Sequence, residues 1–205
     1  EKFIISGRKR IEPWLSAVFQ AEHLNLLLGN GLPTAIAELA GAQAVPMAKV
    51  VFGTSYDGAI NAHAEKTART MGRGSANIED QFRSALALLE GFKVVDEPAS
   101  EKLREALDEP FKKLLNSVLL LESGIATARD LESTKKAEAA LQSFLLSFAS
   151  RAASRERLHI FTSNYDRLIE HGCDLAGLRV IDRFVGALNP VFRSSRAEDD
   201  LHYNP

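Results

Sequence analysis

The chain has 205 residues and a formal net charge of −2. That length suffices for one large domain with a substantial core, or for one domain that carries an insertion. The charge gives no global basic field, so no direct nucleic-acid partner is expected. The only cysteine, Cys173, excludes an internal disulfide and a multi-cysteine zinc site. One thiol suits a reducing compartment, and no apolar run is long enough to span a bilayer, so we expect a cytoplasmic protein with no membrane partner and no metal ion.

The first elements are predicted to be a helix, a strand and a second helix. Residues 10–22 place apolar side chains along one stripe of a helix, namely Ile11, Trp14, Leu15, Val18 and Phe19. The apolar run His23–Leu28 stops at Gly29-Asn30-Gly31, which is typical of a buried parallel strand. A helix is then predicted from Pro33 to Leu39, because proline is well placed in a first helical turn.

The middle of the chain is predicted to be helical. Glycines punctuate residues 41–76, which we interpret as a mobile or inserted helical segment. Ser75 or Asn77 can cap the next helix, and Gly91 is predicted to end it. The acidic residues Glu79 and Asp80 suit its first turn. Its expected apolar face comprises Ile78, Phe82, Leu86 and Leu89.

Two longer helices and a second strand follow. The helices are predicted at about Ser100–Leu121, with Pro110 as a potential break, and at about Ser133–Ser154. The apolar face of the second comprises Ala140, Leu141, Phe144, Leu145 and Phe148. Leu158–Thr162 is predicted as a strand that leads through the turn 163–166 into a helix over 167–176, which Gly177 ends. The run 178–181 is predicted as another buried strand.

This order of elements predicts an α/β fold: a parallel sheet with a large helical insertion over about residues 41–155. We expect residues 1–205 to form a single domain. The chain lacks an initiator Met and ends in a stretch typical of the middle of a loop, Leu201–Pro205, so we also expect it to be C-terminally incomplete.

The first candidate site is the turn Gly29-Asn30-Gly31-Leu32. A glycine-rich turn between a buried strand and a helix lets the backbone approach a phosphate, and the helix N-terminus adds N–H donors. The spacing is not that of the dinucleotide G-x-G-x-x-G motif, because Thr34 occupies the place of the third glycine. A glycine-bearing turn without any ligand is an equally good interpretation.

The second candidate site is Thr162-Ser163-Asn164-Tyr165-Asp166. It also lies where a strand ends and a helix begins, and ligands of open α/β sheets bind at such strand ends. The Asn164 amide offers a donor and an acceptor, which suits ribose hydroxyls or a positioned water. The alternative without a ligand is that Asn164 or Asp166 caps the helix.

Four segments resemble, in order, motifs of sirtuin-like domains in bacterial defence proteins. The segment from Leu158 to Glu170 resembles the family's T-T-N-Y-D-x-L-I-E segment, and it is the most specific of the four. The other three are Gly29–Pro33 for the shortened G-A-G-x-S loop, Asn77–Asp80 for S-I-E-D, and Asp182–Gly186 for D-G-F-V-G.

The resemblance implies a Rossmann-like site for NAD between the two strand ends. Asn164 would be catalytic, facing the nicotinamide ribose and holding the attacking water. The other implied NAD-binding residues are Gly29, Asn30, Gly31, Leu32, Thr162, Ser163 and Asp166, of which the first four would lie against the phosphates. Asp166 would anchor its turn or approach the cofactor.

The implied activity is hydrolysis of NAD to ADP-ribose and nicotinamide in anti-phage defence. The single cysteine and the missing D-F-R-S stretch argue against protein deacetylation. The family's catalytic His lies in an L-H-G-S segment that does not occur here, so a non-catalytic NAD- or nucleotide-binding and oligomerisation module stays open as the alternative. Expected partners are further copies of the chain and a HerA-type ATPase or an Argonaute-like protein.

None of the five histidines is assigned a catalytic role. His171 is interpreted as a helix-end residue and His202 as part of a surface loop, with an approach of His202 to the site as the alternative. His23 and His159 are expected at the entry ends of the two strands, and His63 in the inserted helical segment.

Overall fold

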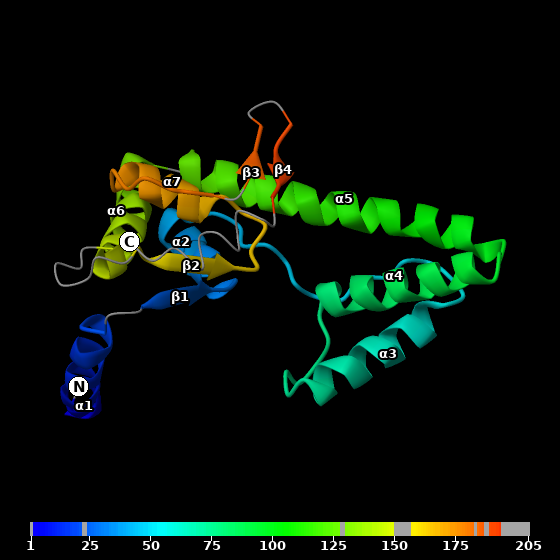
Figure 1. The fold of residues 1–205 in the computed structure, drawn as a ribbon, viewed down its shortest axis with the longest axis horizontal. Coiled ribbons are helices and arrows are strands. Elements are labelled where there is room, and N and C mark those ends of the chain that lie inside the picture. Colours follow the sequence, from blue (N-terminus) through cyan, green and yellow to red (C-terminus); the bar gives the residue numbers. More distant parts are fainter. Residues whose placement is uncertain are drawn as a thin grey trace.

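The computed structural model describes residues 2–21, 24–127, 130–149, 157–182, 184–186 and 189–193. Its centre is a parallel pair of strands, β1 (Asn25–Leu28) and β2 (His159–Thr162) (Figure 1). Leu28 lies beside Thr162 in the ladder, so both strands end at the same edge. The two strand–turn–helix units predicted from the sequence are therefore neighbours in space.

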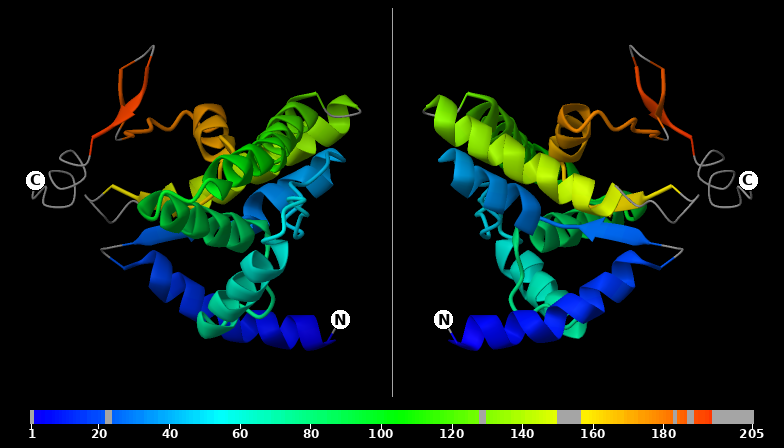
Figure 2. Two further views of the ribbon diagram at one scale, coloured as in Figure 1. Left: turned by 90° about the vertical axis from the view of Figure 1, so that its right-hand side faces the viewer. Right: turned by 90° about the vertical axis from the view of Figure 1, so that its left-hand side faces the viewer.

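One face of this strand pair carries the main core. The helices packed there are α2 (Gly31–Ala40), α6 (Leu131–Ala149), α7 (Leu168–Leu175) and the C-terminal half of α5 (Ala99–Ala126) (Figure 2). The buried apolar residues of this core include Leu28 of β1 and, from the helices, Ile36, Ala40, Leu121, Ile125, Leu141, Leu145 and Leu168. The opposite face is exposed among the described residues, since Leu27 is 78% exposed and Phe161 is 44% exposed. The first strand therefore lies where predicted, but the prediction that it is buried is wrong for this face.

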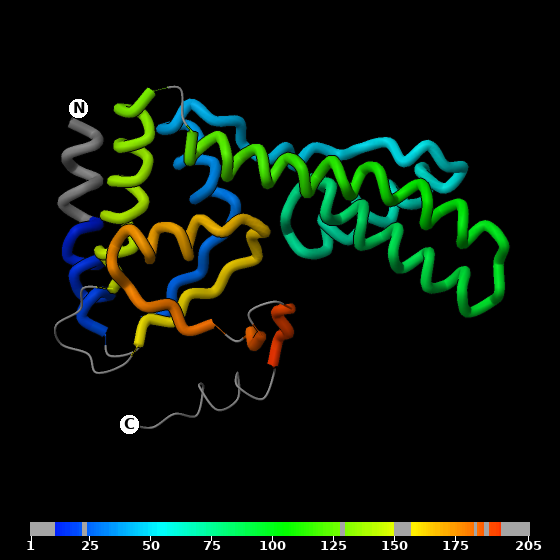
Figure 3. Tube along the Cα trace, turned by 90° about the horizontal axis from the view of Figure 1, so that it is seen from above, coloured from blue at the N-terminus to red at the C-terminus, as the bar shows by residue number. Residues whose placement is uncertain are grey.

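A helical arm projects from this core. It consists of α3 (Asp57–Thr70), α4 (Ile78–Val94) and the N-terminal half of α5, which extend away from the sheet in two views (Figures 1 and 3). The arm has its own apolar core, made of Phe52, Ile60, Ala85, Leu89, Leu103 and Leu107. Thus α5 contributes side chains to both cores, and only part of the expected insertion is separate from the main core.

The start of α4 confirms its predicted cap. The Asn77 side chain accepts the Asp80 N–H, and the Asp80 carboxylate accepts the Asn77 N–H, forming a capping box. The predicted end at Gly91 is wrong, since the helix continues to Val94. Leu86 is 51% exposed rather than on the buried face, because polar Gln81 and Ser84 are buried instead.

Helix α5 is longer than predicted. It runs without a break through Pro110 and ends at Ala126 rather than at Leu121. Packing on both sides of the proline explains the continuity, because Leu107 lies in the arm core and Leu114 is also buried. Tertiary burial here outweighs the hydrogen bond that a proline removes.

Two predicted apolar segments differ from expectation. Residues 178–182 form no strand; instead the short strands β3 (Phe184–Val185) and β4 (Val191–Phe192) pair antiparallel. Helix α1 (Lys2–Phe19) exposes Ile11 and Trp14 of its predicted stripe, at 52% and 64%, while Phe19 contacts Phe148 of α6. The described structure is thus a mostly helical α/β arrangement with a two-stranded parallel sheet. Among the described helices, none is long and apolar enough to cross a membrane.

Candidate functional site

A hydrogen bond joins the two turns that the sequence singles out. Nδ2 of Asn164 donates to the backbone oxygen of Gly29 at 3.1 Å. The same oxygen accepts the N–H of Leu32 at 3.2 Å, within its own turn. Both turns therefore meet at the carboxyl edge of the strand pair, where ligands of parallel sheets bind.

The first turn leads directly into α2, two residues earlier than predicted. Gly31 is the first residue of the helix and Asn30 precedes it without a side-chain cap. The Thr34 hydroxyl donates to the Asn30 oxygen at 2.7 Å, which ties the turn to the helix. A Cβ atom added at Gly29 or Gly31 would meet nothing within 4 Å, so the space over both glycines is open.

A shallow apolar hollow lies beside this turn. Its volume is about 350 Å³, and its lining residues are Leu27, Leu28, Gly29, Gly31, Leu32, Ala35 and Phe144. Leu32 is half-buried, whereas the flanking Asn30 and Gly31 are exposed. Apolar side chains and the exposed main chain of the turn thus line the same hollow.

In the second turn, Asp166 rather than Asn164 accepts from the following helix. Oδ1 of Asp166 accepts the Leu168 N–H at 3.2 Å, just before α7. The Asn164 N–H donates to the Thr162 hydroxyl oxygen at 3.0 Å, which braces the turn against β2. Ser163 is exposed, and the Asn164 side chain is left to reach Gly29.

Burial and charge act on the Asp166 carboxyl. Burial raises its pKa, the Leu168 N–H bond works in the opposite direction, and the nearby Glu122 carboxylate raises it further. The net pKa lies above the ordinary value of 3.8. Of the two roles implied for Asp166, anchoring the turn or approaching the cofactor, the geometry fits the anchoring role.

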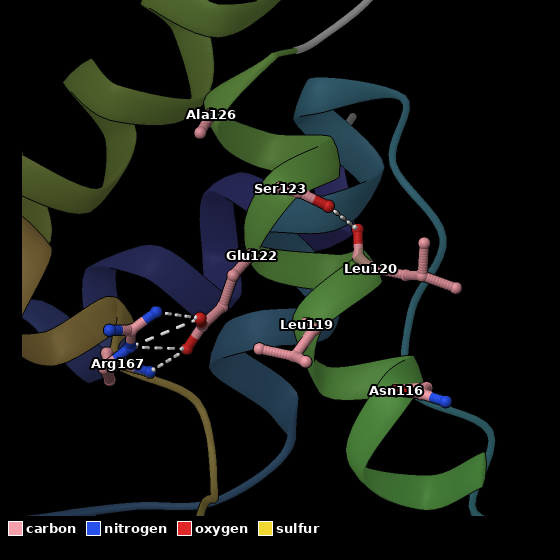
Figure 4. A pocket seen from close by; sticks show the side chains of 7 residues that line it. All are labelled: Asn116, Leu119, Leu120, Glu122, Ser123, Ala126 and Arg167. Atoms are coloured by element: carbon pink, nitrogen blue, oxygen red, sulfur yellow. Dashed lines mark hydrogen bonds and ion pairs between the residues drawn. The ribbon is translucent and has the colours of Figure 1, made fainter. Parts of the chain in front are cut away.

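Glu122 of α5 holds the end of the second turn (Figure 4). Its Oε1 accepts the backbone N–H of Arg167 at 2.8 Å, and its Oε2 accepts from Nη2 of the guanidinium at 2.6 Å. These bonds to Arg167 hold the pKa of Glu122 below its usual value. The pair borders an open hollow of about 660 Å³ along α5, which is also lined by Asn116, Leu119, Leu120, Ser123 and Ala126.

The first turn of α4 also approaches this site. Burial, together with the charge and hydrogen bonding of Glu79, raises the pKa of the Tyr165 hydroxyl. The next residue, Asp80, is 2% exposed and pairs with Arg73. Residues from four separated segments thus converge on the edge of the sheet.

The described histidines lie outside this convergence. His159 begins β2, at the opposite end of the strand from Asn164, and His171 lies within α7. Nδ1 of His63 is 2.9 Å from the Ser84 hydroxyl, between α3 and α4. His23, His202 and Arg183 lie outside the described residues. Within the described ranges no group of three or more His, Cys, Asp or Glu side chains is arranged to hold a metal ion.

Sequence reasoning missed Glu122 and Arg167 as parts of this site, and it named Tyr165 within the second candidate turn without giving it a role. Arg167 belongs to the matched segment and could have been considered with Asn164. Glu122 lies 45 residues earlier, on a helix expected to belong to an insertion, and no local pattern marks it. Comparison of the chain with protein-family models, curated proteins and solved structures returned no match.

Proposed function

We propose that this chain hydrolyses NAD to ADP-ribose and nicotinamide, as the sirtuin-like defence domains that it resembles do, and that it acts in anti-phage defence. The observation that carries the proposal is the bond from Asn164 to Gly29, because it brings the two matched motifs to one strand edge. The finer fold assignment, a Rossmann-like domain, belongs to the same proposal and is supported by the parallel pairing of β1 with β2.

The reaction requires little covalent chemistry from the protein. The bond between the nicotinamide nitrogen and the ribose carbon breaks, and its electron pair leaves with neutral nicotinamide. A water oxygen then bonds to that carbon and releases a proton. Catalysis of this kind rests on orienting NAD, excluding bulk water and placing the nucleophile. Asn164 is the proposed group that orients the ribose and the water, using its Oδ1 and its second amide hydrogen.

The first turn is the proposed phosphate-binding segment. The open space over Gly29 and Gly31 allows close approach of a ligand. Pro33 has no N–H, and the amides of Leu32 and Thr34 donate within the turn, so phosphate contacts would fall to Asn30 and Gly31. The apolar hollow beside Leu32 offers a surface for a flat ring of the same ligand.

The deciding experiment is incubation of the full-length protein with NAD, with and without candidate partners, followed by chromatography of the products. Formation of ADP-ribose and nicotinamide, lost in Asn164→Ala, is the expected result. A wild-type protein that leaves NAD intact under all of these conditions would refute the proposed hydrolysis.

The positions of the histidines favour one alternative: a module that binds NAD or a nucleotide without cleaving it. His159 and His171 lie away from the Asn164 turn, so no general base of the family's type is in place among the described residues. In the same experiment this alternative predicts saturable NAD binding, measured by calorimetry, with NAD recovered intact.

Association with further copies, and with a HerA-type ATPase or an Argonaute-like protein, is also part of the proposal. Its support is a set of exposed apolar side chains on one helix, α5: Phe111, Leu115, Leu119 and Leu120. Exposed apolar surface of this kind is common at protein interfaces. Sedimentation of the full-length protein tests self-association directly.

A further inference from the structure

The turn that carries Asn164 is fixed at both ends. At its start, the Asn164 N–H donates to Thr162 of β2. At its end, the Arg167 N–H donates to Glu122, which belongs to a different element, α5. Only Tyr165 and Asp166 separate Asn164 from that second fixed point, so the placement of Asn164 depends on where α5 holds the main chain.

The Glu122 contact differs from an ordinary surface ion pair. The Glu122 side chain is 15% exposed. Its carboxylate accepts hydrogen bonds from the backbone N–H of Arg167 and from Nε and Nη2 of the Arg167 guanidinium. An exposed ion pair contributes little to stability, because water screens the charges and fixing two long side chains costs entropy. A carboxylate that takes a main-chain donor fixes the course of the backbone itself.

We infer that Glu122 is a positioning residue for Asn164: through the Arg167 main chain, it sets the distance between the Asn164 amide and the Gly29 turn. The expected effect of Glu122 on catalysis rests on the proposed function. The positioning itself is a property of the protein without NAD. The two can therefore be tested separately.

The first test needs no NAD. The solvent exchange of the Asn164 side-chain amide, which is bonded to Gly29, is measured by nuclear magnetic resonance in Glu122→Gln and Glu122→Ala. Glu109→Gln is the matched control, because it removes the same charge from the same helix in a pair with Lys112 that is exposed on both sides. Exchange is expected to rise several-fold in both Glu122 variants, more in Ala than in Gln, and to stay unchanged in the control.

The second test measures turnover in the full-length protein. A displacement of about 1 Å can lower a rate roughly 100-fold, so kcat is expected to fall about 10- to 100-fold in Glu122→Ala with KM nearly unchanged. Glu122→Gln, whose amide oxygen still accepts the Arg167 N–H, is expected to recover part of the rate. The control variant is expected to match the wild type.

The outcomes separate the two claims. An Asn164 amide that exchanges equally fast in all three variants and the wild type would overturn the inference, whatever the activity. Faster exchange in the Glu122 variants of a protein that does not cleave NAD would support the positioning and count against the proposed hydrolysis. Should Glu122→Ala fail to fold, the Gln variant carries both measurements.

Discussion

The Asn164 side chain and the Gly29 carbonyl, 135 residues apart in sequence, are joined by a hydrogen bond of 3.1 Å. The donor belongs to the turn after β2 and the acceptor to the turn after β1, so the bond spans the shared edge of both strands. The local alternative, in which Asn164 caps α7, does not occur, because Asp166 accepts the Leu168 N–H instead.

Replacing Asn164 should affect activity far more than stability. Asn164→Ala removes one hydrogen bond of a half-buried group and is expected to lower the free energy of unfolding by about 1 kcal/mol. Loss of an orienting group in the site is expected to lower kcat roughly 100-fold or more. Asn164→Asp, which turns a carboxylate oxygen toward the Gly29 carbonyl, should be less stable than the Ala variant. Urea unfolding and nicotinamide release measure the two effects, and equal stability of both variants would contradict this geometry.

Two glycine-to-alanine changes should shift stability in opposite directions. A Cβ at Gly172 of α7 would lie 2.6 Å from Leu145 Cδ1 and 2.7 Å from Leu141 Cγ, so Gly172→Ala is expected to cost about 1–3 kcal/mol. Gly91 of α4 has nothing within 4 Å of its Cβ position, and Gly91→Ala should stabilise by about 0.5–1 kcal/mol. Thermal unfolding of both variants decides; a gain in Gly172→Ala would show that α7 packs differently.

Gln81 should be a major determinant of the arm. It is 1% exposed, and its amide bonds both backbone groups of Val50 and the Asn61 side chain, at 2.6–2.9 Å. Gln81→Ala leaves these partly buried groups without that partner and is expected to cost about 2–4 kcal/mol. Gln142, with one exposed bond to Leu175, is the matched control, and its Ala variant should lose less than about 1 kcal/mol. Chemical denaturation that gave both variants the same midpoint would argue against this assignment.

The Asp166 carboxyl should make stability depend on pH. Its pKa in the folded protein exceeds 3.8, so the folded state holds this proton more tightly than the unfolded state. The contribution to stability is therefore full at low pH and is lost as the pH rises from below 3.8 through the folded pKa. Asp166→Asn keeps an oxygen for the Leu168 N–H but does not titrate.

As the pH rises, the free energy of unfolding of Asp166→Asn should therefore increase relative to that of the wild type. Asp108→Asn, on an exposed part of α5, controls for loss of a surface carboxylate. Denaturant midpoints at a series of pH values measure the effect. A shift in favour of the wild type would mean that the folded protein prefers the charged form of Asp166.

Local signals in the sequence were enough for several elements. The Asn77 cap, the apolar runs of β1 and β2 and the turn glycine at Gly177, with φ +67°, each appear where predicted. These features depend on residues close in sequence, because capping, short strands and left-handed turns are set by local backbone preferences. The resemblance also implied a site between the two strand ends, and the two candidate turns do meet at that edge.

Features that depend on distant packing were not accessible. The stretch 178–181 has the composition of a buried strand, yet no described strand pairs with it, and composition alone does not specify a partner. Pro110 reads as a break, but Leu107 and Leu114 are buried on either side and keep α5 continuous. Glu122 is one acidic residue among many until the fold brings Arg167 to it.

The position of α5 between the two cores matters for anyone who wishes to trim the protein. A shortened chain that joined Ala40 directly to Leu131 would discard Leu121 and Ile125 from the main core, together with Glu122. The removable part is therefore smaller than the stretch between the two strand units suggests. A minimal version expected to keep the Asn164 turn in place would delete α3 and α4 but keep the C-terminal half of α5 packed against α2 and α6.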